Sequence, residues 1–179
     1  MSKGQDSMEK TREKIRQITM LGMMLAIIIV LSALEHTLPP IPGLPPNMRL
    51  GLSNVVTMYA IFFIEYKQAV LLAVLKSLFV LAIRGGLAGL LSFSGGILAV
   101  FGIIAFAYIF GKNASYIALS ITGAILHNLG QIAVVALILD IGGAVILIYL
   151  PVLIVSGVVM GTVTGSLLIV SMPLLNKLE

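Results

Sequence analysis

The chain is built mainly of long apolar stretches separated by short polar, Gly-rich or Pro-rich stretches. A helix needs about 20 apolar residues to cross roughly 30 Å of hydrocarbon. From the positions of charge, Pro and Gly we predict an all-α integral membrane protein, a bundle of six transmembrane helices. The predicted helices cover about 15–37, 49–64, 67–84, 93–111, 116–139 and 145–171.

The second and third predicted helices are separated only by Glu65-Tyr66-Lys67. One helix over 50–84 would extend about 50 Å, which is too long for a single crossing. We therefore expect a tight hairpin at Glu65–Lys67. The first apolar stretch is longer than the core of a signal peptide and has no small-residue cleavage site after it, so we expect a permanent helix there.

Composition excludes an ordinary soluble enzyme. Of the 179 residues, 59% are hydrophobic and only 10% are charged, against about 25% charged in soluble domains. The absence of cysteine excludes disulfides and thiolate metal sites. The net charge of +4 says little by itself. We expect the lipid bilayer, and no nucleic acid, as a partner.

Lysine and arginine predict the orientation. Six crossings place both termini on one side, which carries eight of these residues against two, Arg49 and Arg84, on the other. The positive-inside rule then makes both termini cytoplasmic. We expect a basic cytoplasmic tail over 1–14, a transmembrane domain over 15–171 and a short cytoplasmic tail over 172–179. The outer segments are then 38–48, 85–92 and 140–144, the first with five of the seven prolines and hence extended.

Lys76 lies near the middle of the third predicted helix, and Arg84 follows eight residues later on nearly the same face. A charge at this depth costs about 2.5 to 3.5 kcal/mol unless a partner or ligand offsets it. The two residues are candidates for a cationic path from the outer side. The alternative is that Lys76 extends to the interface or loses its charge.

His127, Asn128 and Gln131 lie at similar depth in the fifth predicted helix. Lipid offers them no hydrogen-bond partners, so they either bind a molecule or hold helices together. Metal binding by His127 is disfavoured, because His36 is the one other histidine and no carboxylate stands at ligand spacing.

Further polar residues stand near the outer ends of helices. Glu35 ends the first helix and is a candidate counter-ion for Arg84 or Arg49. Asn54 and Ser53, near the outer start of the second helix, are candidates for lining the entrance to a site.

Small residues form strips on two helices. Gly157, Gly161 and Gly165 form two overlapping G-x-x-x-G units, and Gly22 and Ala26 form a weaker version in the first helix. Such strips let another helix approach closely. They either pack within the chain or, facing outward, serve as docking surfaces for a partner membrane protein.

Several catalytic signatures are missing. The sequence has no G-x-x-x-x-G-K-[ST] phosphate-binding loop, and its two aspartates, Asp6 and Asp140, are too far apart to form a magnesium-diphosphate cluster. We therefore expect neither enzymatic activity nor a bound cofactor.

Two segments carry a family resemblance: Leu50-Gly51-Leu52-Ser53-Asn54 after the proline-rich loop, and Gly123-Ala-Ile-Leu-His127-Asn128-Leu-Gly130-Gln131. With six short helices and a basic N-terminus, they resemble the substrate-binding S components of energy-coupling factor (ECF) transporters. The chain is most similar to the group labelled Gx transporter or heptaprenyl diphosphate synthase component I. Glu65-Tyr66-Lys67 departs from the Phe-Gly common at the second turn.

This resemblance implies a protein of the cell membrane that captures a small anionic or aromatic molecule, a micronutrient or precursor, for ATP-driven uptake. A transmembrane coupling subunit and cytosolic ATPases would be its partners. The resemblance further implies a cap at Pro39–Asn47, a site lined by His127, Asn128 and Gln131, and a docking face at Gly22 and Ala26. Two alternatives are a non-catalytic membrane scaffold for a prenyl diphosphate synthase and a small secondary carrier.

Overall fold

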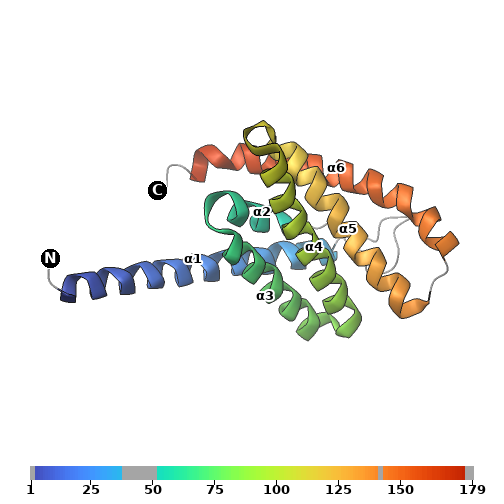
Figure 1. Ribbon diagram of the computed structural model, residues 1–179. Helices are drawn as coiled ribbons and strands as arrows, with labels where there is room; N and C mark the ends of the chain where they lie inside the picture. Colours follow the sequence, from blue (N-terminus) through green and yellow to red (C-terminus); the bar gives the residue numbers. More distant parts are fainter. Residues whose placement is uncertain (1–2, 38–51, 141–142, 176–179) are drawn as a thin grey trace.

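The computed structural model describes residues 3–37, 52–140 and 143–175, which form six α-helices, one short 3-10 helix and no strand (Figure 1). The predicted all-α bundle is confirmed for this part of the chain. The elements are α1 (Lys3–Thr37), α2 (Asn54–Phe63), α3 (Tyr66–Arg84), α4 (Gly86–Phe110), η1 (Gly111–Asn113), α5 (Tyr116–Leu139) and α6 (Gly143–Leu175).

Five of the helices in the described ranges are long and apolar enough to cross a membrane. The exception is α2, whose 10 residues extend about 15 Å, half of the hydrocarbon thickness. The predicted start of this helix at residue 49 is not what the structure shows, since α2 begins at Asn54. The expected cap at Pro39–Asn47 and Arg49 lie outside the described residues.

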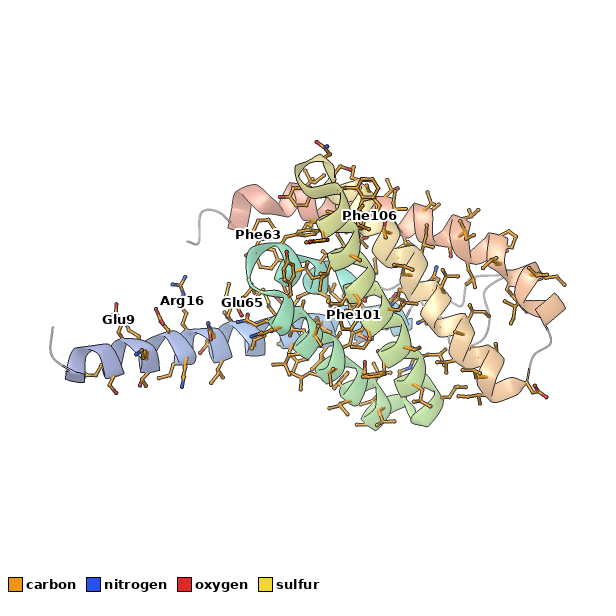
Figure 2. All side chains as sticks on the ribbon, viewed as in Figure 1. Glu9, Arg16, Phe63, Glu65, Phe101 and Phe106 are labelled. Carbon is orange, nitrogen blue, oxygen red and sulfur yellow. The ribbon has the colours of Figure 1, made fainter. Side chains whose placement is uncertain are left out.

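The first helix begins earlier than predicted. Residues from Lys3 onward belong to α1, so most of the predicted tail over 1–14 is helical. Hydropathy detects only the apolar part of this helix. The polar part has opposite charges one turn apart, at Glu9 with Arg12 and at Glu13 with Arg16, a spacing that stabilises helices. Figure 2 shows Glu9 and Arg16 on the part of α1 that projects beyond the other helices.

The predicted break between the second and third helices is confirmed. The chain is extended at Glu65 (φ −158°, ψ 148°), and α3 begins at the next residue. The backbone N–H groups of Gln68 and Ala69 donate to the Glu65 carbonyl, at 3.1 and 3.2 Å. One extended residue therefore replaces the glycine or proline that would have made this turn visible in the sequence.

The predicted outer loop over 85–92 is wrong, because α4 begins at Gly86. Gly85 alone makes the turn between α3 and α4, with φ 86° and ψ 178°, a conformation that favours glycine. Gly89 does not break the helix. A Cβ atom at Gly89 would lie 2.7 Å from the Leu81 Cβ, so this glycine lets α4 pack directly against α3.

The glycine strip of α6 packs within the chain. A Cβ atom at Gly157 would lie 3.0 Å from the Ile125 Cα, and one at Gly165 would lie 3.0 Å from the Ile117 Cα, while Gly161 faces the backbone of Ile121. The docking surface expected at Gly157, Gly161 and Gly165 is therefore corrected: α5 already covers it. Of the two alternatives for this strip, the structure shows the internal one.

The small residues of α1 lie on the outside. Gly22 and Ala26 are exposed, and a Cβ atom at Gly22 would have nothing within 4 Å. This helix contacts α2 and α3, whereas α3, α4, α5 and α6 pack on one another in sequence order. Figure 1 shows the start of α1 and the end of α6 at the same end of the bundle.

We expect Gly161→Ala to destabilise the protein by about 1 to 3 kcal/mol, because the added methyl group overpacks the α5–α6 interface. Gly22→Ala is the matched control in another helix. Its methyl group meets open space, so it leaves the stability unchanged or raises it by up to about 1 kcal/mol through lower backbone entropy. Denaturant unfolding in detergent followed by circular dichroism measures both. Equal effects of the two substitutions would contradict the packing described here.

The orientation is testable in this cysteine-free chain. Glu9→Cys lies on the projecting segment of α1, and Gly86→Cys lies at the start of α4, where an added Cβ meets nothing within 4 Å. If the termini are cytoplasmic, a membrane-impermeant maleimide labels Gly86→Cys in intact cells and labels Glu9→Cys only after permeabilisation. The reverse pattern would invert the predicted orientation.

Candidate functional site

Lys76 lies in the interior of the bundle. Its side chain is only 6% exposed, and its Nζ donates a hydrogen bond of 2.8 Å to the Asn54 Oδ1. Asn54 is the first residue of α2, so this bond joins the middle of α3 to the beginning of the short helix. The predicted ion-pair or ligand role of Lys76 therefore has a structural basis: this lysine points inward and not to lipid.

Glu35 reaches the same region from α1. Its side chain is 5% exposed, and its Oε1 accepts a hydrogen bond of 3.2 Å from the backbone N–H of Leu52. Glu35 and Lys76 line the same cavity, where opposite charges attract each other more strongly than in water. A carboxylate just before α2 also complements the positive end of the helix dipole. Residues of α1 and α3 thus hold the start of α2 from two sides.

His127 and Gln131 stand one turn apart on α5, and their Nε2 atoms are 3.1 Å apart. Both side chains are buried. The imidazole of His127 faces α4 at Gly95, where an added Cβ would lie 2.9 Å from the ring Cε1 and Nδ1. The glycine is therefore what leaves space for the histidine between α4 and α5.

Asn128 does not belong to this group. Its Nδ2 donates to the Leu153 carbonyl at 2.9 Å and to the Ser156 Oγ at 3.1 Å, both in α6. Successive residues of a helix point in different directions, so Asn128 faces α6 whereas His127, the residue before it, faces α4. The hydrogen bonds of the Asn128 Nδ2 go to α6 and Asn128 lines neither of the two cavities beside Lys76, so its predicted substrate contact stays a prediction without support from the geometry.

A polar cavity lies between α1, α3, α4 and α5. It encloses about 410 Å³ of space not filled by protein atoms, including its open part. The interior is narrow in this conformation, so a ligand larger than a few water molecules would have to displace side chains. The polar residues that line the cavity are Ser32, Glu35, Lys76, Arg84, Ser92, His127 and Gln131.

This cavity contains five of the seven residues predicted to bind substrate. Asn54 instead faces a second cavity beyond Lys76, and Asn128 lines neither. Ser53 is fully buried beside Asn54. Among the described residues, no three His, Asp or Glu side chains gather to hold a metal ion.

Ser32 and Ser92 were missed by sequence reasoning. Ser32 precedes Glu35 by one helical turn, so it shares the face of α1 that Glu35 presents. Ser92 was hidden by the wrong start of the fourth helix, which placed it in a loop. With α4 beginning at Gly86, Ser92 lies on the buried side of this helix.

Three polar atoms of the cavity residues are buried without a hydrogen-bond partner, the Ser92 Oγ, the His127 Nδ1 and the Gln131 Oε1. Leaving a buried polar group unpaired costs about 1 to 3 kcal/mol. In native proteins such groups therefore often mark a site where water or a ligand supplies the missing bond. Together with the two cations, they make this cavity the candidate binding site.

We expect Asn54→Leu to destabilise the protein by about 1.5 to 3 kcal/mol, because it removes the acceptor of a charged hydrogen bond. The double variant Asn54→Leu/Lys76→Met should recover much of this loss, because no unpaired charge then remains in the interior. Denaturant unfolding of the wild type, both single variants and the double variant measures the coupling. Purely additive losses would show that the Lys76–Asn54 bond contributes nothing specific.

Comparisons with known proteins agree with this architecture. The solved structure of the S component of a bacterial ECF transporter superposes with a TM-score of 0.69 at 21% identity, over 93% of this chain and 99% of that chain. At this identity the likeness shows a shared fold. No curated protein matches the chain by sequence.

The membrane assignment is confirmed by the five long apolar helices and by this fold, and the protein is a multi-pass protein of the cell membrane. The family model for heptaprenyl diphosphate synthase component I matches residues 24–170, well over half of the sequence. The chain therefore belongs to the heptaprenyl diphosphate synthase component I family.

Proposed function

We propose that this protein is a non-catalytic membrane subunit that captures a small molecule from the outer side of the membrane for ATP-driven uptake. The observation that carries the proposal is the polar cavity that Lys76 and His127 both line. The fold shared with an ECF transporter S component supports it. In this proposal the unpaired Gln131 Oε1 and Ser92 Oγ bind polar atoms of the substrate.

The charges of the cavity favour an anionic substrate. Lys76 and Arg84 contribute two positive charges, and Glu35 contributes one negative charge. A neutral imidazole at His127 leaves one positive charge in excess. Because the surroundings are of low polarity, such an excess attracts an anion more strongly than it would in water. An aromatic anion would satisfy the same charges.

The energy for uptake would come from separate subunits. The sequence contains no phosphate-binding loop for ATP, so cytosolic ATPases and a transmembrane coupling subunit would supply it. Gly22 and Ala26 on the exposed face of α1 are our candidates for the surface that contacts the coupling subunit. Small residues in this position allow a helix of the partner to approach closely.

We expect mass spectrometry of the protein, purified in mild detergent, to identify a co-purifying small anion. Lys76→Ala should weaken binding of that molecule at least tenfold, because the substitution removes the cation at the centre of the site. Equilibrium binding to protein in lipid nanodiscs measures the change.

Lys67→Ala is the matched control. Lys67 also lies in α3 but is exposed near its first residue, so this variant loses the same charge outside the cavity. Its affinity should equal that of the wild type. Equal affinity of Lys76→Ala and wild type would exclude the cavity as the binding site.

The alternative of a scaffold for a prenyl diphosphate synthase has one observation in its favour. Residues 7–16 of α1 form an exposed, charged helical segment outside the bundle, on which a soluble enzyme could dock. Affinity purification from native membranes separates the proposals: ATPases with a membrane subunit support capture for uptake, whereas a soluble synthase alone supports the scaffold. Uptake into vesicles driven by an ion gradient without ATP would instead support a secondary carrier.

A further inference from the structure

A second cavity lies on the other side of Lys76. It encloses about 490 Å³ of space not filled by protein atoms, including its open part, and its interior is as narrow as that of the polar cavity, so a ligand would have to displace side chains here too. Lys76 is the residue that lines both cavities, and its hydrogen-bond partner Asn54 lines the second. The Lys76–Asn54 bond therefore lies at the boundary between the polar cavity and the second cavity.

The walls of this second cavity are mainly apolar and small. Residues without bulky side chains come from α3, α4 and α5, namely Ala73, Gly96, Ala99, Gly123 and Ala124. Met58 of α2 and Met160 of α6 close its sides. Methionine side chains are flexible and adapt to apolar groups of different shape.

Of the three hydroxyl groups in this wall, those of Thr57, Ser120 and Thr164, two are already paired. The Ser120 Oγ and the Thr164 Oγ1 lie 2.6 Å apart, and the Thr164 hydroxyl is also within 2.8 Å of the Met160 carbonyl. These groups are therefore occupied by one another and by the helix backbone. The strongest polar group at this cavity is the Lys76 ammonium at its edge.

From this arrangement we infer that the two cavities form one site for an amphiphilic ligand, an anionic head joined to a compact apolar body. The inference rests on the proposed function and specifies the class of its substrate. The head, with a single negative charge, binds Lys76 and the donors of the polar cavity. The body occupies the apolar cavity, and the ligand reaches it by displacing Asn54 from Lys76.

The matching of charge and surface supports this division. The polar cavity has one positive charge in excess, which a head of one negative charge balances. Beyond Lys76, no second charged residue lines the apolar cavity, and two of its three hydroxyl groups are already hydrogen-bonded, the third being that of Thr57. Burial of apolar atoms there is instead favourable, by about 0.8 kcal/mol for each methylene group, which corresponds to about fourfold in affinity.

A series of carboxylates with growing chains tests the inference: acetate, butanoate and hexanoate. The concentration that gives half of the maximal rise in melting temperature is measured for the protein in nanodiscs. We expect this concentration to fall about fourfold per methylene group until the cavity is filled. Lys76→Met should abolish the stabilisation by all three compounds.

Variants of α4 show whether the alkyl chain of the carboxylate occupies the apolar cavity. Gly96→Ala adds a methyl group to the cavity wall at 3.6 Å from the Ala73 Cβ, an ordinary contact that the fold tolerates. It should raise the half-saturating concentration of hexanoate at least threefold and leave that of acetate unchanged. Ala99→Leu, which fills more of the cavity, should raise the half-saturating concentration of hexanoate at least tenfold.

Gly86→Ala is the matched control, since it adds the same methyl group to α4 where nothing lies within 4 Å. If Gly86→Ala and Gly96→Ala changed the half-saturating concentration of hexanoate equally, the inference would be overturned, because the alkyl chain of hexanoate would then lie in the bilayer and not in the apolar cavity. Stabilisation that depends on Lys76 but not on chain length would also overturn it and would leave the proposed capture of an anion intact. No stabilisation by any of the carboxylates overturns the inference too, whereas the co-purified molecule decides the proposed function independently.

Discussion

A positive charge in the middle of a membrane helix has to be balanced inside the protein, because lipid offers it neither water nor a counter-ion. In this structure the balance for Lys76 comes from two other elements, the Asn54 amide oxygen of α2 and the Glu35 carboxylate of α1. The arrangement of α1, α2 and α3 around one ammonium group follows from this requirement. The polar cavity lies beside the same group, so the interaction that holds these helices together also provides the chemistry of the site.

The other half of the bundle depends on close contact between backbones. The glycines of α4, α5 and α6 bring these helices together at Gly95, Gly130 and Gly161. Helices that approach this closely gain van der Waals contacts, which is the main attraction available between helices in lipid. They also leave space for large side chains at chosen points, such as the His127 ring against Gly95. We interpret α4, α5 and α6 as the part of the bundle that backbone contact holds together, whereas polar contacts with α1 and α3 hold the start of α2.

The sequence predicted those features that depend on composition and on depth in the membrane. The apolar stretches predicted the helices. The free-energy cost of a charge exposed to lipid identified Lys76 as an inward-facing residue. The break at Glu65 could be placed because one helix over both stretches would have been too long. Five of the seven predicted site residues line one cavity for the same reason, since polar groups in lipid must gather in the interior.

What could not be predicted depends on direction and on single contacts. Asn128 and His127 are equally polar neighbours, yet only the contact with α6 decides that Asn128 faces away from the cavity. The direction of the α6 glycine strip likewise depends on where α5 packs. The turn at Gly85 needs one residue, whereas the run of glycine and serine after it has the composition of a loop. A hydropathy pattern identifies only the apolar part of a helix, so it did not predict the polar start of α1.

The 35 residues of α1 form one helix about 52 Å long, with the projecting charged segment at one end and Glu35 two residues from the other. A continuous helix transmits a tilt or an axial shift along its whole length unless it bends. In the function proposed above, a protein that binds the projecting segment and thereby repositions Glu35 would change the affinity of the cavity for its ligand. Because coupling of binding free energies is reciprocal, an occupied cavity would alter the affinity for that protein by the same factor. In that proposal, the length of this helix would link binding on one side of the membrane to binding on the other.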